Sequence, residues 1–392
     1  MGMVKIYRSS DYGAPAMHGA AGGMLPVLQA CLVDGYGEKS VTSLTHSGGV
    51  VTCVTAIGHG LITNARQLIA GANEDGYNGE FIITVVDSST FTYKTTGVTV
   101  NTATGTITAK SAPAGWTREF NATNISVFRP GAGARHFLRV DDTSTQLARV
   151  VGYENMTGVS TGTGVFPTTT QQTGGLYWRK SQLTTTVPTA GWILIADDRT
   201  MYFWVDGNTT TPLSYSYMGT YGFGEFISYK PGDAYNTFII GDHGLASTQS
   251  FFGYICTYYS SVTTSSAFGL YAPRSYTQAG TSVPLGKIGD SSKTTNAGHM
   301  SDSGFIYPHP VDGGLWMKQI EYAEGASVGA LSVLRGIMRG VYTALHNNPL
   351  AHLDMFDGSG DFVGKQFIYL AVTTNTSSLR WAIFDISAEW EY

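Results

Sequence analysis

The feature that most constrains this chain is the stretch 191–207, in which two apolar runs flank a short polar turn. The runs are residues 192–195 and 201–205, and both are filled with the β-branched and aromatic side chains that favour buried strands. Successive side chains of a strand point to opposite faces. In the second run one face would carry Met201, Phe203 and Val205, and the other Tyr202 and Trp204. Because both faces are apolar, the sequence predicts a central β-hairpin that is covered on both sides.

The composition favours a β protein. Charged residues make up only 13% of the 392 residues, whereas glycine (49 residues) and aromatic residues (12%) are frequent. An apolar fraction of 42% is sufficient to form a core. We therefore predict a mainly β fold, with a β-sandwich-like main body, a small inserted β-sandwich or barrel domain, and few short helices. So few charges indicate large surfaces buried against other subunits; the alternative is a β protein with a hydroxyl-rich surface.

Charge and cysteine content exclude several classes of protein. A net charge of −5 provides no basic surface for nucleic acid, so no nucleic-acid partner is expected. Cys31, Cys53 and Cys256 form no CxxC pair, which argues against a disulfide framework or a zinc site and favours folding in a reducing cytoplasm. No run approaches the ~20 apolar residues of a membrane helix, and the N-terminus lacks an apolar signal core. We expect neither a membrane span nor ordinary secretion.

The pattern changes over residues 38–112. Five short strands are expected there, at 50–55, 67–72, 80–87, 90–95 and 104–109. The flanking segments 35–40 and 110–116 resemble loops, and the main pattern resumes at Trp116. Compact domains with neighbouring ends are tolerated as insertions in loops. We therefore predict an inserted module at 38–112 within a main domain formed by residues 1–37 and 113–392.

The main domain is expected to contain one helix and many strands. Leucines at helical spacing and a proline in the first turn predict a helix over 24–33, ended by Gly35. Thr/Gly-rich stretches at 157–175 and 260–296 predict long loops. Strands are predicted at 4–7, 125–129, 136–140, 147–153, 223–229, 237–240, 251–259, 316–322, 333–339, 366–373 and 379–386.

Two pairs of aspartates are candidates for catalytic acids. Asp141 with Asp142 and Asp197 with Asp198 would suit the paired carboxylates of a glycoside hydrolase. Both pairs, however, fall at expected tight turns, where aspartate binds its own backbone. The turn interpretation is preferred. The sequence therefore predicts no catalytic residue, and a protein that is not an enzyme.

No metal or cofactor site is predicted either. Residues 354–361 contain aspartates spaced as in a calcium loop, but Met355 and Phe356 interrupt the ligand pattern, which favours a turn. The four histidines of the last hundred residues have neither helical nor zinc-finger spacing. These are His299, His309, His346 and His352.

Aromatic residues are the remaining candidates for function. Buried, they would belong to the core or to subunit interfaces; exposed, they could stack on sugars of a host surface. The first interpretation is preferred because most lie in expected strands. Residues 379–392 are expected to contribute to an interface, since two aromatics would otherwise be exposed at the chain end. The candidate core or interface aromatics are Trp178, Trp204, Trp316, Trp390 and Tyr392.

The sequence of the inserted segment resembles that of a small Ig-like β module that recurs in virion and tail proteins of tailed bacteriophages. The matching stretches are 51–61 (VTCVTAIGHGL), 69–81 (IAGANEDGYNGEF) and 85–93 (VVDSSTFTY). They follow the pattern "T-x-x-x-H-G-L … I-x-G-A … Y-N-G-x-[FY] … V-x-D-x-x-T-F-x-Y". This resemblance covers about a fifth of the chain and implies a β domain without an active site.

The rest of the chain resembles virion structural proteins of tailed phages and prophages, through stretches 30–37, 114–120, 138–143, 149–156 and 175–180. The resemblance implies a structural component that assembles in the host bacterial cytoplasm and resides in the virion. We expect a cyclic homo-oligomer in the tail, nozzle or baseplate region, with itself and other virion proteins as partners. The alternatives are a head-decoration (capsid cement) protein and a carbohydrate-binding host-receptor protein.

Overall fold

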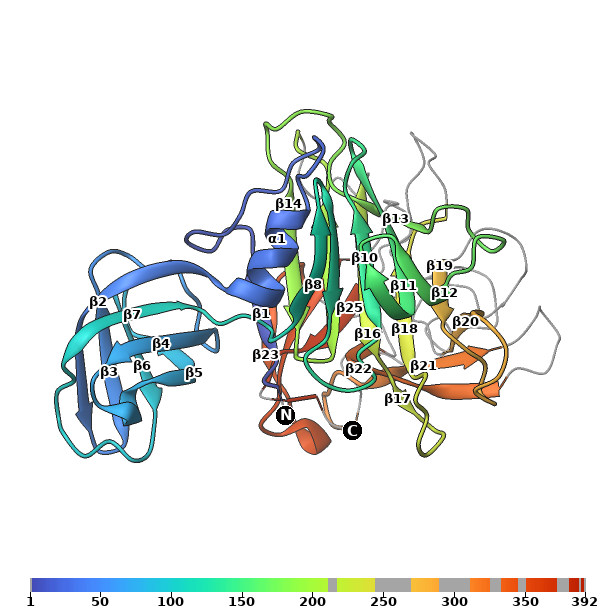
Figure 1. Cartoon of the computed structure of the whole chain (residues 1–392). Helices are drawn as coiled ribbons and strands as arrows, with labels where there is room; N and C mark the ends of the chain where they lie inside the picture. The colour runs from blue at the N-terminus through green and yellow to red at the C-terminus, as the bar shows by residue number, and fades with distance from the viewer. Residues whose placement is uncertain are drawn as a thin grey trace.

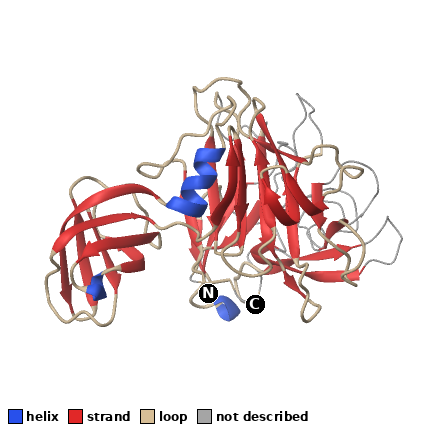
Figure 2. Cartoon of the chain, in the orientation of Figure 1, coloured by secondary structure: helices blue, strands red, loops and turns tan. Residues whose placement is uncertain are grey.

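The computed structural model describes residues 2–210, 217–243, 269–288, 311–324, 333–344, 350–371, 381–387 and 389–390. The described chain is mainly β, as predicted, with large antiparallel sheets, one small barrel and few short helices (Figures 1 and 2). The helical elements are α1 (Leu25–Gln29), the π-helical η1 (Ala30–Asp34) and the 3-10 turns η2 (Asp75–Tyr77) and η3 (Gly360–Phe362).

The largest sheet has thirteen strands in the order β1-β14-β15-β16-β18-β19-β20-β21-β22-β25-β24-β23, and β17 pairs with β22. The strands are β1 (Lys5–Arg8), β14 (Gly191–Ala196), β15 (Thr200–Asp206), β16 (Met218–Glu225), β17 (Ile227–Ser228), β18 (Thr237–Gly241), β19 (Gly269–Ala272), β20 (Val283–Ile288), β21 (Met317–Glu324), β22 (Val333–Ala344), β23 (Met355–Asp357), β24 (Gln366–Ala371) and β25 (Trp381–Asp385).

A second sheet of six strands has the order β12-β11-β10-β9-β8, with β13 also paired to β11. Its strands are β8 (Thr117–Ala122), β9 (Ile125–Arg129), β10 (Phe137–Asp141), β11 (Leu147–Gly158), β12 (Thr161–Phe166) and β13 (Leu176–Arg179). In Figure 1 this sheet lies in front of β14–β18, so the main body is a sandwich, as the sequence predicts.

Two cores cover the two faces of the β14–β15 hairpin. Met201, Phe203 and Val205 pack in the first core, with residues of the six-stranded sheet such as Phe128 and Leu138. Tyr202 and Trp204 pack in the second core, against side chains of β21, β22, β24 and β25. All seven residues of β15 are buried. The prediction of a hairpin covered on both sides is confirmed, with the division of side chains that strand alternation requires.

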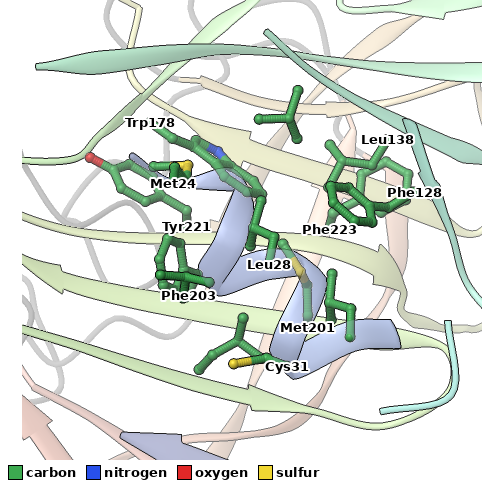
Figure 3. Close-up of a cluster of buried hydrophobic side chains, with 14 of the residues drawn as sticks. Met24, Leu28, Cys31, Phe128, Leu138, Trp178, Met201, Phe203, Tyr221 and Phe223 are labelled. Carbon is green, nitrogen blue, oxygen red and sulfur yellow. The ribbon is translucent and has the colours of Figure 1, made fainter. Parts of the chain in front are cut away.

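The helix fills the first core (Figure 3). Leu28, Cys31 and Leu32 are fully buried, and Leu25 packs at the edge of the cluster. The predicted helix over 24–33 is confirmed, but its second half widens into the π-helical η1. Gly35 ends it with a positive φ of 74°, and its N–H donates to the carbonyl of Ala30 at 2.8 Å. Its ψ of 174° differs from that of the usual left-handed helix stop, and this combination of φ and ψ is adopted essentially only by glycine.

The segment predicted to be an inserted module forms a closed barrel with the strand order β2-β3-β6-β5-β4-β7. It has its own hydrophobic cluster, which includes Leu44, Tyr77, Phe91 and Tyr93. Figure 1 places it beside the main body, joined through β2 and β7. Its strands are β2 (Tyr36–Ser47), β3 (Val50–Thr55), β4 (Arg66–Ala72), β5 (Gly79–Val85), β6 (Thr90–Lys94) and β7 (Gly105–Ser111).

Several local predictions were wrong. The loop expected at 35–40 is mostly the start of β2, because this strand runs directly from the main body into the barrel, whereas 110–116 is a loop except for its first two residues, which end β7. The long loops expected at 157–175 and 260–296 contain β12, β19 and β20. The exposed edge strand β8 was missed, since its polar sequence TREFNA lacks an apolar alternation. The strand expected at 251–259 lies outside the described residues.

We propose that the barrel is an independently folding domain, because it closes on itself around a separate core. Replacing residues 40–110 with a short Gly-Ser linker should leave a main body that melts cooperatively by near-ultraviolet circular dichroism. The intact chain is the control. An aggregated or molten product would contradict the proposal.

Trp204→Ala should lower the free energy of unfolding by about 3–5 kcal/mol, as other large aromatic truncations in cores do. Trp204 is 5% exposed, and its indole N–H donates to the carbonyl of Ala371 at 2.6 Å. Urea titration measures the loss. The matched control is Trp316→Ala, where the ring is 37% exposed and the expected loss is below about 1 kcal/mol. Equal losses at the two positions would refute this assignment of the core.

Candidate functional site

The structure places most of the candidate aromatics inside the single chain. Trp178, Trp204 and Trp390 are buried, and each indole N–H donates to a backbone carbonyl. Trp390 is only 2% exposed, so it gives no reason to expect an interface at the chain end. Trp316 is half-exposed, and Tyr392 lies outside the described residues.

The aspartates weighed as catalytic acids are held by other groups. Asp197 accepts hydrogen bonds from the N–H groups of Arg199 and Thr200, which confirms the turn interpretation. It also forms a buried ion pair with Arg339, whose Nη2 lies 2.7 Å from Oδ2. Burial raises the pKa of Asp197 although Arg339 opposes the shift. This ion pair joins the central turn to β22.

Asp142 has a long-range role that the sequence did not reveal. Its carboxylate pairs with the buried ammonium of Lys180. Its Oδ2 accepts the N–H of Met24 at 2.7 Å and that of Leu25 at 3.3 Å. A carboxylate at this position satisfies amides that the first helical turn leaves without partners. No local motif could have indicated the contact, because the partners are 117 and 118 residues apart.

A cluster of eight charged, ionisable and aromatic side chains joins the two sheets; we call it the turn cluster. Arg274 forms a bidentate ion pair with Glu154, with N–O distances of 2.7 and 2.8 Å. The guanidinium lies 4.5 Å from the ring centre of Tyr235, which in turn stacks on His136 at 6.0 Å. The members of the turn cluster are His136, Glu154, Asp233, Tyr235, Arg274, Tyr276, Glu324 and Arg335.

Arg335 holds the other half of the turn cluster. It is fully buried and donates to Asp233 at 2.9 Å and to Glu324 at 3.0 Å. Glu324 also accepts the N–H of Tyr276. All three carboxylates of the cluster are therefore bound by guanidinium groups. The arrangement links three loops to the three strands β11, β21 and β22, and each of its carboxylates is paired with a guanidinium.

The buried His136 and the half-buried His352 are both neutral because of their surroundings. Burial lowers the pKa of His136 and that of His352 to about 4. His352 packs 4.7 Å from the ring centre of Trp204, and its Nδ1 accepts the N–H of Ala371 at 3.0 Å. A ring nitrogen that accepts a hydrogen bond cannot be protonated. Of the other predicted candidates, His299, His309 and His346 lie outside the described residues.

A groove of about 510 Å³ lies where the barrel meets the main body. Its lining includes Ser10, Tyr12, His59, Leu61 and Asp87. His59 is not available for chemistry, because its Nδ1 accepts the N–H of Leu61 at 3.1 Å and its Nε2 lies 3.4 Å from the Thr90 carbonyl. The groove therefore offers an exposed aromatic ring, hydroxyls and a carboxylate, which suits binding better than catalysis.

The described residues contain no group of three or more His, Cys, Asp or Glu side chains suited to a metal ion. The stretch weighed as a calcium loop forms β23 and η3, and the Asp354 carboxylate accepts the N–H of Ala351 at 2.6 Å. Among the described helices, none has the length and apolar character needed to span a membrane.

Comparison with known proteins identifies no family. No protein-family model and no curated protein matches the chain. Among solved structures, the chain is similar to a phage phi92 endosialidase, with 9% identity and a TM-score of 0.16. The match covers 91% of this chain and 52% of that chain, so the chain spans about half the length of the matched structure.

One prediction is corrected by this comparison. The sequence was interpreted as that of a protein without enzymatic activity, but the matching structure is titled an enzyme. We therefore withdraw the assignment. A TM-score of 0.16 transfers no activity to this chain. The clamped carboxylates described above identify no reacting group.

The two neutral histidines make stability depend on pH. Histidine titrates near 6.5 when unfolded. Between that value and about 4, the unfolded chain binds protons that the folded chain does not. Stability is therefore fully present above pH 6.5 and should fall with pH, on the order of 1 kcal/mol per pH unit for each histidine.

Urea unfolding at pH 8, 6.5, 5.5 and 5 would measure this slope. The double variant His136→Gln/His352→Gln should lose less stability than the parent between pH 6.5 and 5, each protein being referred to its own value at pH 8. Identical slopes in the two proteins would contradict the assignment.

Proposed function

We propose that this chain is a virion component of a tailed phage or prophage. In this proposal it assembles as a cyclic homo-oligomer in the tail, nozzle or baseplate region and binds other virion proteins there. Assembly takes place in the cytoplasm of the host bacterium. The observation that carries the proposal is the fold of the inserted segment, whose sequence resembles a recurrent phage β module.

The residues of that resemblance are the ones that build the barrel. The side chain of Asn78 forms two hydrogen bonds with the backbone of Ala72: its oxygen accepts the N–H at 3.0 Å, and its nitrogen donates to the carbonyl at 2.8 Å. Asp87 accepts the N–H groups of Ser89 and Thr90 and so forms the turn before β6. Tyr77, Phe91 and Tyr93 fill the barrel core. The residues of the module pattern thus have structural roles in the barrel. This supports a structural function for the module.

Contacts with the main body also fix the orientation of the barrel. Lys5 of β1 pairs with Glu80 of the barrel at 2.9 Å. Arg66 donates to the carbonyl of Ser387, near the end of the chain. Contacts from both chain ends therefore brace the barrel at its base while the remainder projects (Figure 1). A fixed projection of this kind suits contact with a neighbouring subunit in a ring, where both surfaces must meet at a defined angle.

The proposal is tested by electron cryomicroscopy of the phage particle that carries the chain. We expect copies arranged in a closed ring on the tail, with each copy contacting the next through an interface on the order of 2,000 Å² or more, as in obligate assemblies. A particle in which no copy touches another would refute the cyclic assembly.

A position on the capsid would instead support head decoration. Native mass spectrometry of the purified chain provides the independent measure of oligomer order. A glycan array with the same sample tests the receptor alternative. In that alternative the binding site would be the groove beside Tyr12. Saturable glycan binding that Tyr12→Ala abolishes, without loss of folding, would favour that alternative.

A further inference from the structure

We propose that Arg129 and Arg135 form a binding site for an oxyanion, a carboxylate or a phosphate group, on the outer face of the six-stranded sheet. Both residues belong to the hairpin that joins β9 to β10, and both side chains are half-buried. This face is opposite to the one that packs in the first core. The proposal does not depend on the position of the chain in a virion.

Arg129 is fixed by two contacts. Its Nε donates to the backbone carbonyl of Arg135 at 2.8 Å, and its guanidinium lies 4.6 Å from the ring centre of Phe137. Arg135 is fixed in a similar way, since its Nε donates to the carbonyl of Pro130 at 3.3 Å. These contacts use only the Nε donors. The terminal nitrogens of both side chains remain without a hydrogen-bond partner among the described residues.

The two positive charges are not neutralised by any described carboxylate within ion-pair distance. The neighbouring Arg139, by contrast, pairs with Asp141 at 3.0 Å, and Arg274 pairs with Glu154. Burial lowers the pKa of Arg129, the positive charge of Arg135 lowers it further, and the carboxylate of Glu119 opposes both effects. Glu119 therefore offsets the repulsion between the two guanidinium groups only in part, and a bound oxyanion would reduce it further.

The backbone of Arg135 has an uncommon conformation, which it shares with six other described residues that are not glycine. Its φ is 57°, a left-handed conformation that glycine or asparagine adopts at lower cost. A long cationic side chain is nevertheless present there, beside a guanidinium already held in place. Preorganised guanidinium groups recognise carboxylate and phosphate through paired N–H donors, so this is the ligand chemistry that the site fits.

The experiment compares anions on the full-length protein. Thermal unfolding is followed in sodium phosphate, sodium citrate and sodium acetate, each against sodium chloride of equal ionic strength. A ligand that binds only the folded state raises the midpoint in a saturable way. We expect this for phosphate or for the carboxylates, with isothermal titration giving the affinity; the stronger of the two classes identifies the natural ligand group.

Arg129→Gln/Arg135→Gln should weaken the binding at least tenfold. Arg118→Gln, which removes an exposed arginine from β8, should leave it unchanged. If the double variant does not fold, Arg135→Gln alone keeps Arg129 over Phe137 and should still weaken binding. Equal responses in all variants, or no saturable response in the parent beyond chloride, would overturn the proposal.

Discussion

The burial of both faces of the β14–β15 hairpin is the constraint on which the rest of the structure depends. A strand with apolar side chains on both faces must be covered twice, and one six-stranded sheet covers only one face. The large sheet therefore returns over itself, so that β21, β22, β24 and β25 cover the other face. The three-layered main body follows from this requirement.

A core of this kind leaves polar turns at its margins that must be held in place. Ion pairs do this at three positions: Asp197 with Arg339, Asp142 with Lys180, and the turn cluster. Buried ion pairs contribute little net stability, because desolvation opposes the attraction, but breaking one is costly. Their effect here is to specify which turn meets which strand. At these three positions each carboxylate is held by a cationic side chain.

Much of the fold could be predicted from the sequence, because its strongest signals are local. The alternation in 201–205 gave the correct face to each side chain of β15, and Gly35 marked the end of the helix. What failed was either weakly patterned or non-local. The strands β8 and β12 are rich in polar residues and glycine, so alternation does not reveal them. The partners of Asp142 and Arg335 come from distant segments, and single charged residues carry no signature of such contacts.

The barrel illustrates why a recognisable sequence can identify a fold without identifying a function. The residues of its sequence pattern form the turn at Asp87, the hydrogen bonds between Asn78 and Ala72, and the aromatic core. Most of these groups are used by the fold itself, although Asp87 also lines the groove beside Tyr12. Binding therefore depends mainly on surface groups whose donors or acceptors the fold leaves unused. Arg129 and Arg135 hold their hairpin through the Nε donors, while their terminal nitrogens have no hydrogen-bond partner among the described residues. These unused donors are the groups that the proposed oxyanion would bind.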